Sequence, residues 1–349
     1  MASPPRRTLA IAHAVLIGIA LASTATVVGS AQRSPRRPAV AVEPIAAILE
    51  AFQSHAIVAL GEGPHGNEQG LAFRLALIRD PRFSAIVNDI VVESGSARYQ
   101  DGMDRFVRGE LPDTVLREVQ ENSAVSTPVW DRAMYGDFYR AIRDLNANRP
   151  PEQRLRVLLG DPPIEWSAVK TADDYRAILS QRDSHPAGVI RREVIARGRR
   201  ALVIYGDGHL LARTERPAQS LTGIVEASGT TVFTVTSTFA NLGQFQTDVA
   251  SWRTPALARL DGTRLGPVPY EFLFGPLPPV DFFRDHPSIE DHYDAVLYLG
   301  ATMTLGRLAY PRCAEPDYVK MRVDRMVVTG MPQAGIADRL SADCNAARR

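Results

Sequence analysis

The sequence predicts an α/β protein with a three-layer αβα architecture and a mainly parallel sheet. Two observations lead to this fold class. Short apolar runs recur along the chain, and segments with helical spacing of apolar residues lie between them. Strands that alternate with helices favour a parallel sheet with helices on both faces. With 349 residues, 45% of them hydrophobic and 23% charged, the composition is that of one large globular domain, or two at most.

The expected strands are the apolar runs, several of which end in glycine next to an acidic residue: 57–61, 86–95, 156–161, 201–205, 231–236 and 293–299. The segments between them, and the C-terminal tail, have apolar residues at helical spacing: 44–54, 67–79, 97–148, 171–198, 217–228 and the residues after 311. Residues 97–148 are expected to form helical insertions into the strand–helix alternation. Residues 240–290, rich in Pro and Gly, are expected to be irregular.

The N-terminus has the pattern of an export signal. An Arg pair precedes an apolar run that ends near Leu21, and small residues follow up to Ala31. We therefore expect residues 1–31 to be a signal peptide and the protein to be periplasmic or secreted. The alternative is an uncleaved N-terminal membrane anchor. Residues 32–43 are expected to be a flexible tether, and no later stretch is apolar enough to span a bilayer.

The two cysteines, Cys313 and Cys344, lie in a C-terminal extension over residues 311–349, which follows an α/β domain over residues 44–310. An isolated pair of cysteines in an oxidising compartment is expected to form a disulfide. This disulfide would fasten the C-terminal segment.

The first strand ends in a polar loop that suggests a functional site. The run 57–61 breaks into a Gly- and Pro-containing loop with Glu62 and His65, and a helix is expected to follow from residue 67. In open α/β sheets, ligands bind beyond the carboxyl ends of the strands. Glu62 and His65 are therefore placed where such a site would form.

Acidic residues and histidines also follow the other strands. The strand ends carry Glu62 with His65, Glu93, Asp161, and Asp207 with His209. Imidazoles oriented by carboxylates are suited to general acid–base chemistry. The sequence has no Gly-x-Ser-x-Gly elbow, Walker loop or dinucleotide fingerprint, so water is the expected nucleophile. A net charge of +1 gives no strong field toward nucleic acid or anionic lipid.

Structural roles are the alternatives for these residues. Glu62 could cap the helix that begins near Asn67. Glu93 could form a salt bridge with Arg74. Asp161 could cap a loop, and Asp207 could stabilise a turn.

The residues Leu60–Gly66, Leu-Gly-Glu-Gly-Pro-His-Gly, resemble the Gly-Glu-x-x-His-Gly signature of the erythromycin esterase family, within the ChaN-like superfamily. The resemblance spans about residues 44–300 and continues at Arg74, Glu93, Trp130–Asn146, Gly160–Asp161, Tyr205–His209 and Tyr293–Val296. Two positions depart from the family pattern His-Asn-x-His, because Gly206 and Asp207 stand where the family has the first His and the Asn.

This resemblance implies hydrolysis of a small-molecule ester or lactone with no metal and no cofactor. It implies that His65 is the general base that activates water, and that Glu62 and Glu93 orient it. Arg74 and His209 would bind or polarise the carbonyl oxygen.

Asp161 and Asp207 are candidate substrate-binding residues. Two other functions remain open at this point. A metal-dependent hydrolase or protease could use His65, His209, Glu62 and Glu93 as ligands. A non-catalytic, ChaN-like envelope protein could bind haem or another ligand.

Overall fold

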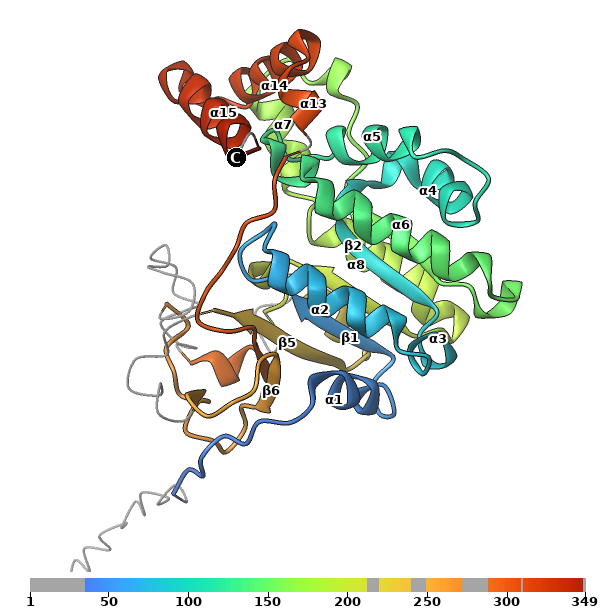
Figure 1. Ribbon diagram of the computed structural model, residues 1–349, viewed down its shortest axis with the longest axis vertical. Coiled ribbons are helices and arrows are strands. Elements are labelled where there is room, and N and C mark those ends of the chain that lie inside the picture. The colour runs from blue at the N-terminus through green and yellow to red at the C-terminus, as the bar shows by residue number, and fades with distance from the viewer. Residues whose placement is uncertain (1–34, 212–219, 240–248, 272–287, 309, 348–349) are drawn as a thin grey trace, which may run out of the picture. The chain divides into compact units, whose positions relative to one another are not determined.

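The structure is a computed structural model that describes residues 35–211, 220–239, 249–271, 288–308 and 310–347. Its centre is a seven-stranded sheet with the strand order β3-β2-β4-β1-β5-β7-β6. Each pair of neighbouring strands is parallel except β7 and β6, which are antiparallel. The predicted mainly parallel α/β fold is therefore confirmed (Figure 1).

The strands are β1 (Ile57–Gly61), β2 (Asp89–Ser96), β3 (Arg156–Asp161), β4 (Ala201–Tyr205), β5 (Val232–Thr238), β6 (Ala256–Arg259) and β7 (Ala295–Tyr298). Six of them correspond to predicted strands, although β2 begins later than expected because Phe83–Ile86 form a short helix. β6 lies in the segment that we expected to be irregular. It has only four residues and pairs on one side with β7, so its sequence carries too short an apolar pattern to be recognised.

Helices cover both faces of the sheet, and alternate strand residues supply the two cores. In β1, Val58 and Leu60 belong to one buried cluster, and Ile57 and Ala59 belong to the other. This alternation follows from the two-residue period of a strand. The first cluster includes apolar side chains of α1 (Pro44–Ala51), α2 (Glu68–Arg79), α3 (Phe83–Ile86), α4 (Gln100–Val107), α5 (Thr114–Glu121) and α6 (Ala133–Ala147). The second includes α8 (Ser184–Val189) and α9 (Leu221–Glu226).

The predicted helix over 171–198 is broken in the structure. Four residues separate the helix α7 (Ala172–Leu179) from α8, which begins at Ser184. Pro186 explains the break, because it lacks the N–H that a continuous helix would need there, whereas proline fits the first turn of a new helix. The break leaves a turn over residues 180–183, which contains Arg182 and Asp183.

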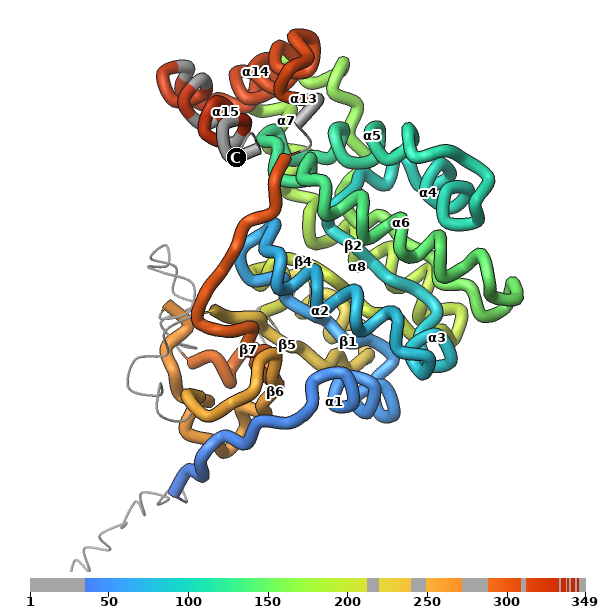
Figure 2. Tube along the Cα trace, viewed as in Figure 1, coloured from blue at the N-terminus to red at the C-terminus, as the bar shows by residue number. Residues whose placement is uncertain are grey.

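The C-terminal extension is helical, with α13 (Tyr310–Cys313), α14 (Pro316–Val328) and α15 (Gln333–Ala347). Cys313 and Cys344 form the predicted disulfide, with an S–S distance of 2.13 Å. Figure 2 shows the irregular segment after β7, residues 299–308, which passes the start of α2. This segment is hydrogen-bonded to the loop ahead of α2, since Gly306 N donates to Gly66 O at 2.7 Å.

The described residues ahead of α1 lie against the sheet edge. Arg36 forms an ion pair with Glu290, and Val42 N donates to Leu257 O of β6 at 2.8 Å. The predicted signal peptide over 1–31 lies outside the described residues. Within the part of the chain that is described, no helix is both long and apolar enough to cross a membrane.

Candidate functional site

Glu62 is the buried centre of the loop after β1. Its side chain accepts a hydrogen bond from His65 Nδ1 at 2.8 Å through Oε2, and Arg74 Nη1 lies 3.1 Å from its Oε1. Burial raises the pKa of Glu62, but Arg74 and His65 outweigh this effect and lower it. The carboxylate does not cap α2, because Asn67 fills that role by accepting from Gly70 N at 2.6 Å.

His65 lies beside Glu62 and is about one-third exposed. The indole of Trp130 packs edge-on against its ring, with 4.7 Å between the ring centroids. Burial disfavours the imidazolium, but the hydrogen bond with Glu62 and the charge of Glu93 raise the pKa of His65 to about 9. His65 is thus an oriented and strongly basic imidazole.

Glu93 lies in β2, buried between groups that come from other elements. Gly206 N donates to its Oε2 at 2.7 Å, and His209 Nε2 lies 3.5 Å from its Oε1. Arg182 also pairs with Oε1. Burial raises the pKa of Glu93, yet His209, His65 and Arg182 lower it overall. The salt bridge with Arg74 that we considered as the alternative role of Glu93 is not formed, because Arg74 on α2 pairs with Glu62.

Asp161 ends β3 and is 1% exposed. It accepts a hydrogen bond from Ala124 N, and Arg182 Nε lies 3.4 Å from its Oδ1. Burial raises the pKa of Asp161 to about 7, although Arg182 and Ala124 oppose that shift. Arg182 therefore bridges two buried carboxylates, Glu93 and Asp161.

Asp207 follows β4 and connects three strands. Its Oδ2 accepts from Gly63 N at 2.7 Å and its Oδ1 from Ser237 N at 3.3 Å. These bonds hold the loop after β1 against the end of β5. Burial raises the pKa of Asp207 to about 6. Asp207 thus links the ends of these strands, and it also lines the pocket beside the histidines.

The ring of His209 lies between two carboxylates, Glu93 and Asp183. Its Nδ1 lies 2.8 Å from Asp183 Oδ1, in the turn between α7 and α8. The structure thus adds Arg182 and Asp183 to the predicted residues. Sequence reasoning missed them because the segment that contains them has the composition of a solvated helix. Pro186, four residues after Arg182, is the signal that could have indicated the break.

A pocket of about 570 Å³ opens beside these residues. It is lined by both histidines, by Asp207 and by small or apolar residues: Gly63, Pro64, Gly206, Gly208, Ser237, Thr238, Phe239 and Met303. Glu62, Glu93, Arg74 and Asp161 lie behind this wall. The pocket therefore presents two imidazoles to a ligand, with the carboxylates that control them buried.

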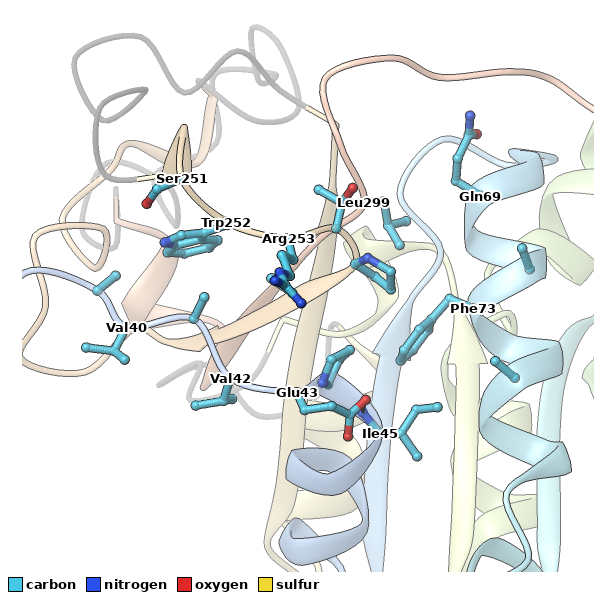
Figure 3. Close-up of a pocket in the computed structure, with 18 residues that line it drawn as sticks. Val40, Val42, Glu43, Ile45, Gln69, Phe73, Ser251, Trp252, Arg253 and Leu299 are labelled. Atoms are coloured by element: carbon cyan, nitrogen blue, oxygen red, sulfur yellow. Dashed lines mark hydrogen bonds between the residues drawn. The ribbon is translucent and has the colours of Figure 1, made fainter.

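A larger pocket of about 970 Å³ lies between the residues ahead of α1, α2 and the segment that leads into β6 (Figure 3). Its lining has two charged side chains, Glu43 and Arg253, and no histidine. The carboxylate of Glu43 already accepts from Ile45 N and Ala46 N, at the start of α1. This pocket lacks the groups that acid–base chemistry needs.

The candidate residues do not form a ready metal centre. Among the residues that the structure describes, no group of three or more His, Cys, Asp and Glu side chains is arranged to hold a metal ion. The carboxylates near the histidines are instead engaged by arginines and backbone amides.

The fold can be compared with proteins of known structure. No family model matches this sequence, and no curated protein matches it. Among solved structures, a mutant of erythromycin esterase EreC in its open conformation is similar at 12% identity, over 76% of this chain and 95% of that one, with a TM-score of 0.51. The chain shares the erythromycin esterase fold. The resemblance that the motif Leu60–Gly66 indicates is thus confirmed at the level of the fold.

Two other structures are less similar. One is a Bacillus cereus protein at 11% identity, over 74% of this chain and 92% of that chain, with a TM-score of 0.48. The other is ChaN of Campylobacter jejuni, described with cofacial heme binding, at 12% identity over 56% and 86% of the two chains, with a TM-score of 0.39.

Proposed function

We propose that this protein is a metal-independent hydrolase of a small-molecule ester or lactone. The observation that carries the proposal is the pair Glu62–His65. Glu62 holds Nδ1 of His65 at 2.8 Å, and the imidazole lines the pocket. A histidine fixed through one nitrogen by a buried carboxylate can take a proton from water at the other nitrogen. The erythromycin esterase fold agrees with this chemistry.

In the proposed reaction, His65 removes a proton from water as the water oxygen bonds to the carbonyl carbon. Negative charge develops on the carbonyl oxygen, and His209, on the same pocket wall, polarises it. The bond from the carbonyl carbon to the alcohol oxygen then breaks, and the proton held by His65 passes to that oxygen. The products are an acid and an alcohol, or a hydroxy acid if the substrate is a lactone.

Glu62 and Arg74 act one layer behind the pocket. Arg74 keeps Glu62 ionised, and ionised Glu62 orients His65 and raises its pKa. We therefore assign Arg74 to the support of the base and not to the carbonyl oxygen. Glu93 supports both histidines, since its charge raises the pKa of each.

The test is hydrolysis of a panel of aryl esters and lactones by the purified protein, with and without EDTA, beside the variant His65→Ala. His55→Ala is the matched control, because His55 lies before β1, at the opposite end of the strand from His65. We expect turnover that resists EDTA, is lost in His65→Ala and is kept in His55→Ala. Turnover that persists in His65→Ala, or that EDTA removes, would overturn the proposal.

A further inference from the structure

The turn between α7 and α8 brings a second carboxylate to a histidine. Asp183 lies in this turn, and its Oδ1 makes two contacts of 2.8 Å, one with His209 Nδ1 and one with Leu221 N. Leu221 is the first residue of α9, so its N–H has no acceptor within the helix. Asp183 is therefore also held by α9, through a contact separate from the one with His209.

The anchored carboxylate determines how His209 presents its ring. Nδ1 faces Asp183 Oδ1 at 2.8 Å, and the other nitrogen, Nε2, faces Glu93 Oε1 at 3.5 Å. A neutral ring with its proton on Nδ1 would direct the lone pair of Nε2 at a carboxylate. The ring therefore favours the state in which both nitrogens carry a proton.

The groups around His209 act on its charge in both directions. Burial and Arg182 lower the pKa of His209, whereas the hydrogen bond with Asp183 and the charges of Asp183 and Glu93 raise it, and the net effect is a raised pKa. The ring of Tyr205 also contacts His209, edge-on at 5.7 Å between centroids. Asp183 is thus the hydrogen-bonded support of the imidazolium.

We infer that Asp183 is a positioning residue of the site, which holds the doubly protonated ring of His209 at the pocket wall, between Asp183 and Glu93. The site then contains two histidine–carboxylate pairs, Glu62–His65 and Asp183–His209, on one pocket wall. The neighbouring Arg182 keeps Glu93 and Asp161 compensated. The catalytic part of this inference rests on the proposed function, but the hold on His209 is testable without any activity.

The experiment is an NMR titration of the His209 ring in the full chain and in Asp183→Asn. The asparagine Oδ1 still accepts from Leu221 N, so the change removes charge and keeps the anchor. We expect the His209 pKa to fall by at least about one unit in this variant. In the unmodified protein, both ring nitrogens should give the shifts of protonated nitrogens near neutral pH. An unchanged His209 pKa, or an unprotonated Nε2, would overturn the inference.

Two further variants separate this inference from the proposed function. Asp173→Asn, on the exposed side of α7, is the matched control and should leave the His209 titration unchanged. If esters are hydrolysed, Asp183→Asn should lower kcat/KM at neutral pH by about tenfold or more, and Asp183→Glu should restore part of the loss. A protein that shows the NMR shift but hydrolyses nothing would keep the positioning role and refute the proposed function. Unaltered kcat/KM in Asp183→Asn would refute the catalytic part of the inference.

Discussion

Arg74 Nη1 lies 3.1 Å from Glu62 Oε1, and each side chain is only 4% exposed. The family resemblance implies that Arg74 binds the carbonyl oxygen of the substrate. In the structure, Arg74 is instead bound to Glu62, the carboxylate that orients His65. A buried ion pair depends on both partners, because the loss of one leaves an uncompensated charge. This relationship predicts a coupled effect on stability and activity.

Arg74→Met should lower the free energy of unfolding by about 3–5 kcal/mol, because Glu62 would stay buried without its guanidinium. Hydrolysis should fall as well, since an altered Glu62 no longer orients His65. Urea denaturation measures the first effect. The double variant Arg74→Met/Glu62→Gln should recover part of the stability but not the activity. Arg74→Met with unchanged stability would contradict the pairing.

The basicity of His65 predicts how the rate depends on pH. Since the pKa of His65 is about 9, most of the ring is protonated at neutral pH, and only the neutral ring can accept a proton from water. We expect kcat/KM to rise by about tenfold per pH unit in the acidic range, until His209 begins to lose its proton. A rate that falls as pH rises through this range would instead make His65 an acid.

Gly206 permits the close approach of His65 and Glu93. A Cβ at this position would lie 3.0 Å from His65 Cε1 and 3.4 Å from Glu93 Oε2. Gly206→Ala should therefore displace the imidazole, lower its pKa and reduce kcat/KM. NMR titration and kinetics would measure these effects. Gly208→Ala is the matched control in the same loop, because a Cβ there meets nothing within 4 Å. Equal behaviour of the two variants would contradict this role.

Asp161 predicts a pH-dependent change in stability. Its folded pKa of about 7 exceeds the ordinary value of 3.8, so the folded state binds more protons between these two values. The contribution of Asp161 to stability therefore falls as pH rises from about 4 to 7. Asp161→Asn should be more stable than the unmodified protein at pH 8, by at most about 4 kcal/mol, and nearly equal to it at pH 4. Denaturation at both pH values tests this, and a stability gain at pH 4 alone would contradict it.

Removal of the disulfide should lower the free energy of unfolding, mainly because the unfolded chain gains freedom. Cys313 and Cys344 are 31 residues apart, and closing a loop of that length stabilises the folded state by about 3–4 kcal/mol through the unfolded chain. Cys313→Ser/Cys344→Ser should show this loss in urea denaturation. We expect the same loss on reduction of the unmodified protein. Reduction should have no effect on the double variant, and any effect there would point to another cause.

The sequence by itself determined six of the seven strands and the place of the candidate site. Apolar runs that end in Gly and an acid are local patterns, and parallel strands deliver their ends to one edge. Glu62, His65, Glu93 and His209 could be found on that basis. The disulfide followed from the number of cysteines.

The tertiary structure decided which side chains are partners. Arg74 pairs with Glu62 and not with Glu93, and Glu93 pairs with Arg182, 89 residues away. Asp183 reaches His209 only because Pro186 breaks the predicted helix and α9 supplies an anchor. Such pairings depend on which elements meet in space and at what angle. The spacing of residues along one segment does not determine which other segments it contacts.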